Sequence, residues 1–329
     1  MKTFLKVLLA IFLVLTLLIA GVLSYVRFAL PKTGEAPNIK IELTPARVAR
    51  GEYLANNVAL CFSCHGKRDF TKYSGPVIPS TAGAGGGTFD QHLGFPGAYY
   101  ARNISPKTIG NWTDGEIYRS LTQGITKQGD ALFPIMPYSY FSKMSEEDVN
   151  SIIAYLRTLK PTDGDDRVSS SDFPMSLIIN LMPREINHQN IPAKSDKVSY
   201  GKYMTNAGLC NACHTPTDEK GAPIAGMEFA GGFNFILPDG SISRSSNITP
   251  DDETGIGVWT KEMFVKRFKV YQDSAYASPV ISKGQFNTDM PWTDYSGMKT
   301  EDLEAIYDYL RTLNPVKNKV VTFEAVEEV

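Results

Sequence analysis

The sequence predicts a mainly α-helical protein in which one membrane-spanning helix precedes two copies of the same module. Three observations lead to this prediction. The run from Val7 to Val26 contains no charged residue, as expected of a helix in lipid. Residues 44–161 and 199–315 show the same short motifs in the same order. The clearest periodicity in both copies is helical, and strand signals are weak.

The N-terminal run is long enough to cross a bilayer, because about 20 residues at ~1.5 Å each match a hydrocarbon core of ~30 Å. A cleaved signal peptide would have a shorter apolar run followed by a small-x-small site, which is poorly matched here. The sequence therefore favours an uncleaved signal anchor at residues 1–30 over a removed peptide. Lys2 and Lys6 favour a cytoplasmic N-terminus, which places the rest of the chain on the periplasmic side of the cytoplasmic (inner) membrane.

Length and charge narrow the class of protein further. A chain of 329 residues with a hydrophobic fraction of 43% is long and apolar enough for two globular domains. The net charge of −2, with no concentrated basic segment, makes nucleic acid an unlikely partner by simple electrostatics.

The internal repeat defines the domain organisation. The shared motifs are Gly before the cysteines, Cys-x-x-Cys-His, Asn-Ile-Ser/Thr-Pro, Trp-Thr, Met-Pro and Tyr-Leu-Arg-Thr-Leu. We expect one domain at residues 44–161 (the first repeat) and another at 199–315 (the second repeat). A linker at 162–198 joins them, and a tail at 316–329 follows. The linker contains an apolar piece, FPMSLIINLMP, which we expect to dock on one or both repeats rather than to form a flexible tether.

Each repeat is expected to begin and end with a helix. The first helices are predicted at Val48–Leu60 and Val198–Leu209. The last helices carry apolar residues at i, i+3, i+4 and i+7 spacing and stop before Pro161 and Pro315. Ser145 resembles a helix N-cap, whereas Lys299 and Thr300 compete for that role in the second repeat. The best strand candidate is a hairpin over residues 233–243.

All four cysteines lie in two Cys-x-x-Cys-His units, LCFSCH at 60–65 and LCNACH at 209–214. This pattern is the attachment sequence of c-type haem, in which two thiols form thioethers and the adjacent histidine binds the iron. A shared zinc site would need the pairs close together, a thioredoxin-like pair would need a βαβ context, and a disulfide within one unit would add little stability. We therefore predict two covalently bound c-type haems. The residues predicted to hold them are Cys61, Cys64, His65, Cys210, Cys213 and His214.

The second axial ligand of each iron decides between electron transfer and catalysis. Of the two remaining histidines, His92 has no counterpart in the second repeat and His188 lies in the linker. The repeat therefore argues against a second histidine at both irons. Methionines instead occur at two pairs of equivalent positions, Met136 with Met290 and Met144 with Met298.

Local chemistry separates these two pairs. Met136 and Met290 each precede a proline, which favours an extended loop that presents the thioether to a haem face. Met144 directly precedes the Ser145 cap, where it is suited to packing against the helix. We therefore predict Met136 and Met290 as metal ligands, together with His65 and His214. Packing in the core is the alternative role for these methionines.

Other recurring residues have two interpretations each. Trp112 and Trp259 either contact a haem or belong to the core. Asn103 and Asn247 either bond a haem propionate or shape a turn. The glycine-rich run 82–87 lacks the strand-then-helix setting of a phosphate loop, and we expect a flexible loop.

Both repeats resemble class I c-type cytochrome domains, which have Cys-x-x-Cys-His near the N-terminal helix and Met-Pro late in the domain. In more detail, GAPIAGMEFAGG, SSNITPDDETGIGVWT, DMPW and MKTEDLEAIYDYLRTL are similar to segments of the cytochrome c subunits of membrane-bound alcohol and gluconate dehydrogenases. The resemblance covers both repeats but neither the anchor nor the linker. It implies two tandem class I domains, and His/Met ligation at Met136 and Met290.

The resemblance also implies that the first and last helices of each domain cross where a small residue meets an aromatic one. Gly51 with Tyr155 and Gly201 with Tyr309 match these positions. Two departures are clear. The dehydrogenase subunits carry three haem modules rather than two, and this chain has its anchor at the N-terminus rather than the C-terminus. A different electron donor is therefore compatible with the sequence.

The sequence thus favours an exported dihaem cytochrome that carries electrons from a dehydrogenase or quinol-linked complex to a respiratory acceptor. Redox proteins and the membrane are the expected partners. An electron-transfer subunit is favoured over a free-standing enzyme. The alternative is a dihaem redox enzyme, such as a peroxidase or an oxidase of small sulfur compounds, with one open haem site.

Overall fold

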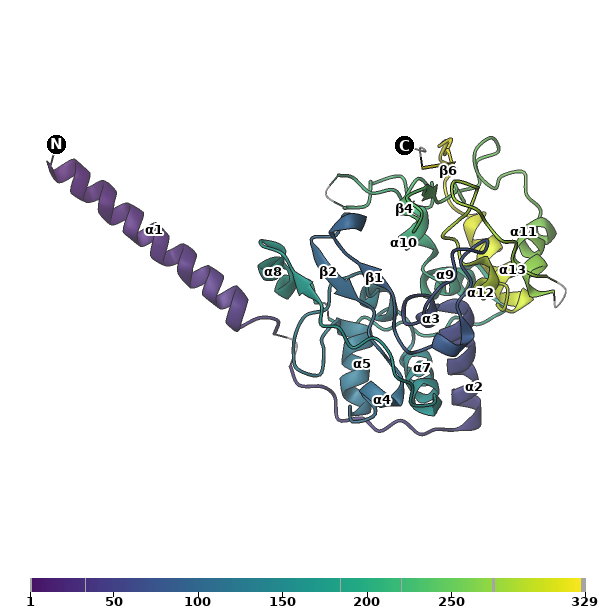
Figure 1. Cartoon of the computed structure of the whole chain (residues 1–329), viewed down its shortest axis with the longest axis horizontal. Helices are drawn as coiled ribbons and strands as arrows, with labels where there is room; N and C mark the ends of the chain where they lie inside the picture. The colour runs from purple at the N-terminus through teal and green to yellow at the C-terminus, as the bar shows by residue number, and fades with distance from the viewer. Residues whose placement is uncertain (1, 33, 184, 220, 274–275, 327–329) are drawn as a thin grey trace.

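The computed structural model describes residues 2–32, 34–183, 185–219, 221–273 and 276–326. Met1 and the last three residues of the predicted tail therefore lie outside the described residues. Helix α1, Lys2–Phe28, projects away from the body of the molecule (Figure 1). It has 27 residues and a mean hydropathy of 2.9 over its most apolar window, so it is long and apolar enough to span a membrane.

The first repeat is built mainly from helices, as predicted. Its first helix, α2 at Pro45–Tyr53, continues into a π-helical turn η1 at Leu54–Val58, close to the predicted end at Leu60. The remaining elements in order are α3 Cys61–Cys64, the 3₁₀ turns η2 Pro79–Thr81 and η3 Gln91–Leu93, α4 Pro106–Ile109, α5 Asp114–Gln123, α6 Tyr138–Phe141 and α7 Glu146–Thr158.

The second repeat has counterparts of α2, α3, α5, α6 and α7 in the same order, but none of α4 among the described residues. Its helical elements are α9 Lys197–Ala207, α10 Cys210–His214, α11 Lys261–Lys269, the 3₁₀ turn η5 Val270–Gln272, α12 Trp292–Tyr295 and α13 Thr300–Leu310. Ser145 caps α7 by accepting the backbone N–H of Asp148. Lys299 is the N-cap of α13 and provides no side-chain bond.

The first and last helices cross in each repeat at a glycine. A Cβ added to Gly51 would lie 1.8 Å from the Ser151 carbonyl oxygen, and one added to Gly201 would lie 1.8 Å from that of Ala305. Tyr155 and Tyr309 lie beside the two glycines, at 2.9 and 3.0 Å from the same added atoms. Only glycine therefore permits this close approach of α2 to α7 and of α9 to α13, which matches the expected meeting of a small and an aromatic residue.

Each repeat also has a small antiparallel sheet of three strands. The predicted hairpin is present as β4 Asn234–Ile236 and β5 Ile242–Arg244, and β6 Phe323–Glu324 from the tail pairs with β5. The first repeat has an unpredicted counterpart, formed by β1 Thr88–Phe89, β2 Gly97–Tyr100 and β3 Ser170–Ser171. In both cases the third strand comes after the last helix of the repeat in the sequence. The chain therefore returns after that helix to pair with a strand of the same repeat.

The apolar piece of the linker packs differently from our expectation. It forms α8, Met175–Ile178, and the 3₁₀ turn η4, Ile179–Leu181, which lie beside the end of α1 (Figure 1). The Asn180 side chain donates to the Val26 carbonyl at 3.1 Å. Leu181 remains 60% exposed, and Ile179 reaches the cavity described below. This apolar piece thus contacts helix α1, whereas other parts of the linker bond to the first repeat through β3 and His188.

The two repeats contact each other reciprocally. Tyr53 donates to Asp302 at 2.5 Å and accepts the Lys299 N–H at 3.0 Å. At the equivalent positions, Tyr203 donates to Asp148 at 2.6 Å and accepts the Ser145 N–H at 3.1 Å. A second reciprocal pair of bonds also joins the repeats. The Asn57 side chain donates to the Asp294 carbonyl, and the Asn206 side chain donates to the Tyr140 carbonyl, both at 3.0 Å. Because each contact occurs twice with the repeats interchanged, an approximate two-fold axis relates them.

Candidate haem sites

One large cavity at the contact between the repeats contains every residue predicted to bind haem. Its volume is about 1540 Å³, larger than the ~300–1,000 Å³ typical of a pocket for one small molecule. Aromatic and aliphatic side chains of both repeats form most of its wall. The predicted residues that line it are Cys61, Cys64, His65, Met136, Cys210, Cys213, His214 and Met290.

The two Cys-x-x-Cys-His units have the same unusual backbone. Leu60 and Leu209, each directly before a first cysteine, have φ values of 51° and 57°. Such left-handed conformations cost a non-glycine residue ~1–3 kcal/mol and persist only where the surroundings impose them. Each leucine starts a short helix that places the two cysteines one turn apart. The same strained backbone conformation therefore precedes the first cysteine in both repeats.

The four thiols are free, without disulfide bonds. Burial raises the pKa of Cys61 to about 12 and that of Cys64 to about 11. Burial likewise raises the pKa of Cys210 and of Cys213 to about 12. The structure therefore gives four neutral thiols in an apolar cavity. A thioether carries no charge, so this environment suits thioether bonds better than thiolate metal ligation.

Both motif histidines have one ring nitrogen fixed by a backbone carbonyl. His65 Nδ1 lies 2.6 Å from the Arg102 oxygen, and His214 Nδ1 lies 2.7 Å from the Ser246 oxygen. A carbonyl can only accept, so Nδ1 carries the hydrogen and Nε2 is left as the free lone pair. Burial lowers the pKa of both imidazoles, which favours the neutral form that binds iron.

The Asn-Ile-Ser/Thr-Pro motif positions these carbonyls. Asn103 accepts the Ser105 N–H at 2.8 Å and donates to the Thr162 carbonyl at 2.7 Å. Asn247 accepts the Thr249 N–H at 2.9 Å and donates to the Val316 carbonyl at 2.7 Å. Both asparagines are buried and make the turn-shaping bonds, and both also line the cavity, so a bond to a haem propionate stays a prediction. The residue just before each asparagine supplies the acceptor for the histidine.

Sequence reasoning missed these acceptors because they are main-chain atoms. Arg102 and Ser246 share no side-chain chemistry, so alignment of the repeats does not mark them. The recurring asparagines that follow them, Asn103 and Asn247, were the sequence feature that could have located these acceptors.

The glycine-rich run is part of the same structure rather than a flexible loop. Gly85 donates its N–H to the His65 carbonyl at 3.0 Å, and Gly87 donates to that of Cys64 at 3.0 Å. In the second repeat, Gly231 donates to the His214 carbonyl at 2.7 Å. Gly85 and Gly231 have φ values of 80° and 74°, and the added Cβ atoms would overlap backbone atoms of the histidine-acceptor segments. Glycine thus permits both the conformation and the close approach.

Met136 and Met290 lie at the start of equivalent turns. In each, the N–H of the residue after proline donates to the methionine carbonyl, at 2.8 Å for Tyr138 and 2.9 Å for Trp292. Pro137 and Pro291 have φ, ψ values near those of an inverse γ-turn. A short helix follows each turn, so the methionine itself stays outside the helix, as its position before proline predicts.

The alternative methionines are buried more deeply. Met144 is 0% exposed and Met298 is 2% exposed, and both belong to the hydrophobic core. Met298 also reaches the cavity wall, whereas Met144 is absent from it. The pair that lines the cavity in both repeats is therefore Met136 with Met290.

The remaining candidates are placed as follows. His92 lies on an exposed 3₁₀ turn and is not part of the cavity wall. His188 bonds the hydroxyl of Tyr118 and the Met144 carbonyl, so it attaches the linker to the first repeat. Trp112 and Trp259 are partly buried, pack against the core and line the cavity, which fits both interpretations of these residues.

Arg102 supplies an observation that fits a carboxylate-bearing ligand. Its Nε atom is buried and has no hydrogen-bond partner among the described residues, although the side chain lines the cavity. Buried guanidinium donors are normally paired, and a carboxylate is their preferred partner. Haem carries two propionates, so this unpaired donor, the neutral thiols and the oriented imidazoles together fit haem.

The two sites adjoin at the contact between the repeats. Burial is the largest cause of the raised pKa of Cys213. Smaller contributions come from the charge of Asp289 in the same repeat and from Cys64 in the other repeat. The pKa of Cys64 likewise responds to Arg68 and Asp289, which form an ion pair across the contact at 2.8 Å. The second cysteines of the two motifs are therefore within electrostatic reach of each other.

No family model matches the chain. The cytochrome c subunit of alcohol dehydrogenase (quinone) from Gluconacetobacter polyoxogenes is 28% identical over 290 residues, which cover 82% of this chain and 57% of the relative. The cytochrome subunit of fructose dehydrogenase from Gluconobacter japonicus is 29% identical over 297 residues, with 83% and 54% covered. A c-type dihaem cytochrome from Cereibacter sphaeroides is 28% identical over 202 residues, with 58% and 63% covered.

The chain spans a little over half the length of the curated dehydrogenase subunits that it matches. The aligned region nevertheless includes most of this chain, and every one of these relatives is described as a cytochrome. The chain is therefore a relative of the cytochrome c subunits of alcohol and fructose dehydrogenases and of a dihaem c-type cytochrome.

Proposed function

We propose that the protein is an exported, membrane-anchored dihaem cytochrome c made of two tandem class I domains. The observation that carries the proposal is the repeated donor set in one cavity. In each repeat, two neutral thiols, one imidazole with a free Nε2 and one methionine line the same space. The relatives described as cytochromes support this function.

Each proposed site takes four residues from one repeat. Cys61 and Cys64 would hold the first haem covalently, with His65 and Met136 as axial ligands. Cys210 and Cys213 would hold the second, with His214 and Met290. When bound, each haem supplies an iron that exchanges one electron, and a thioether ligand favours the reduced state more than a second imidazole does.

The protein's own contribution is orientation and exclusion of water. The carbonyls of Arg102 and Ser246 hold the imidazoles in one tautomer, and the apolar wall would limit the access of solvent to a bound haem. A histidine and a methionine bound to each iron would leave no coordination position for a substrate. This arrangement favours an electron carrier over a dihaem peroxidase or sulfur-compound oxidase.

The partners follow from the same proposal. The donor would be a dehydrogenase or a quinol-linked complex, and the acceptor a respiratory protein, because the relatives include subunits of dehydrogenases. Helix α1 would hold the protein in the cytoplasmic membrane, with both haem domains on the periplasmic side. Electron-transfer encounters of this kind use small, transient interfaces.

Replacement of the proposed methionine ligands tests this function. A methionine–iron(III) bond gives a weak long-wavelength absorption band, which can be counted per haem. Met136→Ala and Met290→Ala should each remove about half of this band, and the double variant should remove all of it. Met144→Leu, a volume-conserving change in the core, should leave the band intact. A band from one haem alone, with the other haem reacting with peroxide, would instead support the enzyme.

A further inference from the structure

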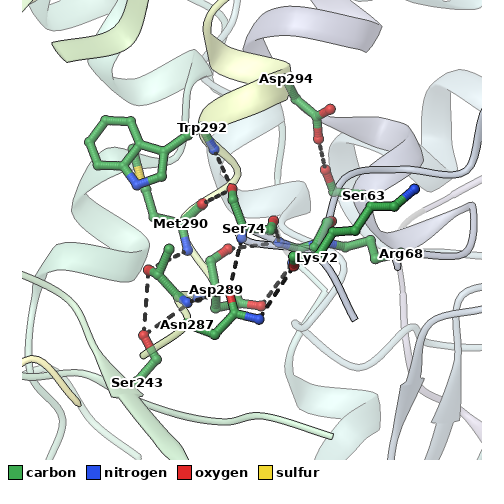
Figure 2. Close-up of polar contacts among 12 residues, drawn as sticks. Ser63, Arg68, Lys72, Ser74, Ser243, Asn287, Asp289, Met290, Trp292 and Asp294 are labelled. Atoms are coloured by element: carbon green, nitrogen blue, oxygen red, sulfur yellow. Dashed lines mark hydrogen bonds and ion pairs between the residues drawn. The ribbon is translucent and has the colours of Figure 1, made fainter. Parts of the chain in front are cut away.

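The turn that carries Met290 is held by a loop of the other repeat. Residues 68–75 of the first repeat, which we name the Ser74 loop, lie against residues 287–292 of the second, the Met290 turn (Figure 2). The Ser74 hydroxyl donates to the Met290 carbonyl at 2.6 Å and accepts the Trp292 N–H at 2.9 Å. One hydroxyl therefore bonds the main chain on both sides of Pro291.

The conformation of Ser74 is itself imposed by this contact. Its φ of 68° lies in the left-handed region, and the residue is 0% exposed. The Ser74 N–H donates to the side chain of Asn287 at 2.9 Å. The amide of Asn287 in turn donates to the carbonyls of Phe70 and Lys72, at 3.2 and 3.3 Å. A strained serine whose N–H and hydroxyl are both bonded by the opposing turn indicates a specific fit.

Arg68 joins the same two segments through charge. Its guanidinium pairs with the Asp289 carboxylate at 2.8 Å and donates to the Asp289 carbonyl at 3.0 Å. It also donates to the carbonyls of Gly75 and Ser74, both at 2.8 Å. The Arg68 side chain is 11% exposed and that of Asp289 is 29% exposed, so this pair is partly shielded from water. Arg68 thus fixes the shape of the Ser74 loop and the residue directly before Met290 (Figure 2).

The first repeat shows no equivalent arrangement at Met136. The Met136 carbonyl accepts the N–H of Tyr138, within its own turn. Among the residues that the structure describes, no side chain of the second repeat bonds to Met136. The contact at Met290 therefore breaks the two-fold relation between the repeats at the position where the second iron would take its distal ligand.

We propose that the Ser74 loop is a positioning device for Met290, so that ligation of the second haem depends on the first repeat. This inference rests on the proposed ligand role of Met290. Ser74, Asn287 and Arg68 act through the main chain of the turn and are positioning residues rather than ligands. Loss of the Ser74 hydroxyl should free the turn and make Met290 easier to displace from iron.

Ser74→Gly isolates the hydroxyl, because glycine accepts a φ of 68° without strain and the loop can keep its shape. The experiment is a titration of imidazole into the oxidised full-length holoprotein carrying Met136→His, so that the long-wavelength band reports Met290 alone. Ser142→Ala is the matched control. Ser142 is also buried and donates to a carbonyl, that of Ser139 at 3.0 Å, but does not contact the Met290 turn.

Ser74→Gly should lower the imidazole concentration that removes half of the band by about fivefold to tenfold, because both hydrogen bonds of the hydroxyl to the turn are lost. Ser142→Ala should change it by less than about twofold. An unchanged midpoint in Ser74→Gly, with the band abolished by Met290→Ala, would overturn the positioning role and leave the ligand assignment standing. A band that survives Met290→Ala would overturn both.

Discussion

The imidazoles of His65 and His214 depend on a chain of contacts that begins with glycine. Gly231 donates to the His214 carbonyl and lets the segment carrying the Ser246 carbonyl pass closely. That carbonyl then fixes His214 Nδ1. Gly85, His65 and Arg102 form the same chain in the first repeat. The orientation of each proposed iron-binding imidazole is therefore set by the backbone around it.

Gly231→Ala should disrupt the second haem site. The new Cβ would lie 2.4 Å from the Ser246 carbonyl carbon, so the acceptor segment must move away from the histidine. Gly226→Ala is the matched control, because its φ of 79° is similar and nothing lies within 4 Å of the added atom. The control should lose only the ~1–2 kcal/mol of a left-handed alanine. Haem content and thermal unfolding measure both effects. Equal losses in the two variants would show that close packing at Gly231 is unimportant.

At the scale of elements, two tyrosine–aspartate hydrogen bonds join helices of different repeats. Tyr53 joins α2 to Asp302 of α13, and Tyr203 joins α9 to Asp148 of α7. Burial raises the pKa of Tyr53 and of Tyr203, and the facing carboxylates of Asp302 and Asp148 raise it further. Both phenols therefore stay protonated in the folded protein and act as donors. Asp148 has a second partner in Arg50, whereas Asp302 has a second partner in Tyr200.

These bonds should make the contact between the repeats sensitive to alkali. The folded pKa of each tyrosine is raised above the unfolded value of about 10, so the stabilisation is fully present below pH ~10 and is lost as the pH rises toward the folded pKa. Above pH ~10, the free energy of unfolding should fall by ~1.4 kcal/mol per pH unit for each tyrosine. Urea unfolding between pH 8 and 11 should show a flatter pH dependence in the Tyr53→Phe, Tyr203→Phe variant. Parallel curves for the two proteins would contradict this account.

Much at this scale could be predicted from the sequence. The helix crossing at Gly51 and Gly201 is encoded by residues that recur in both copies, and the stripe of apolar residues in α7 and α13 marks the buried face. The strands β3 and β6 could not be predicted, because two-residue strands carry no periodicity and form only where the chain meets an existing hairpin edge.

For the whole molecule, the repeat itself allowed prediction of two equivalent donor sets, since a motif that occurs twice excludes chance. It did not predict how the two sets are brought together. The ion pair of Arg68 with Asp289 and the contact of Ser74 with Met290 join residues from different repeats, and neither has a counterpart that alignment could reveal. The docking of the linker beside α1 depends likewise on packing between distant segments.

The whole molecule also combines two repeats related by an approximate two-fold axis with three features that do not follow this symmetry: helix α1, the linker and the Ser74 loop. Helix α1 contacts α8 and η4 of the linker, the linker pairs with the first repeat through β3, and the Ser74 loop reaches from the first repeat to the second (Figure 1 and Figure 2). Two similar donor sets are thus placed in different surroundings. If each donor set holds a haem as proposed, this difference would give the two irons unequal ligand stability within one chain.

The central claim is that each repeat binds one haem covalently, and the intact mass of the denatured full-length protein tests it most directly. The account predicts a chain that carries two haems, one of which is lost in the Cys61→Ala, Cys64→Ala variant and the other in the Cys210→Ala, Cys213→Ala variant. A mass without haem, with each cysteine pair oxidised to a disulfide, would contradict it.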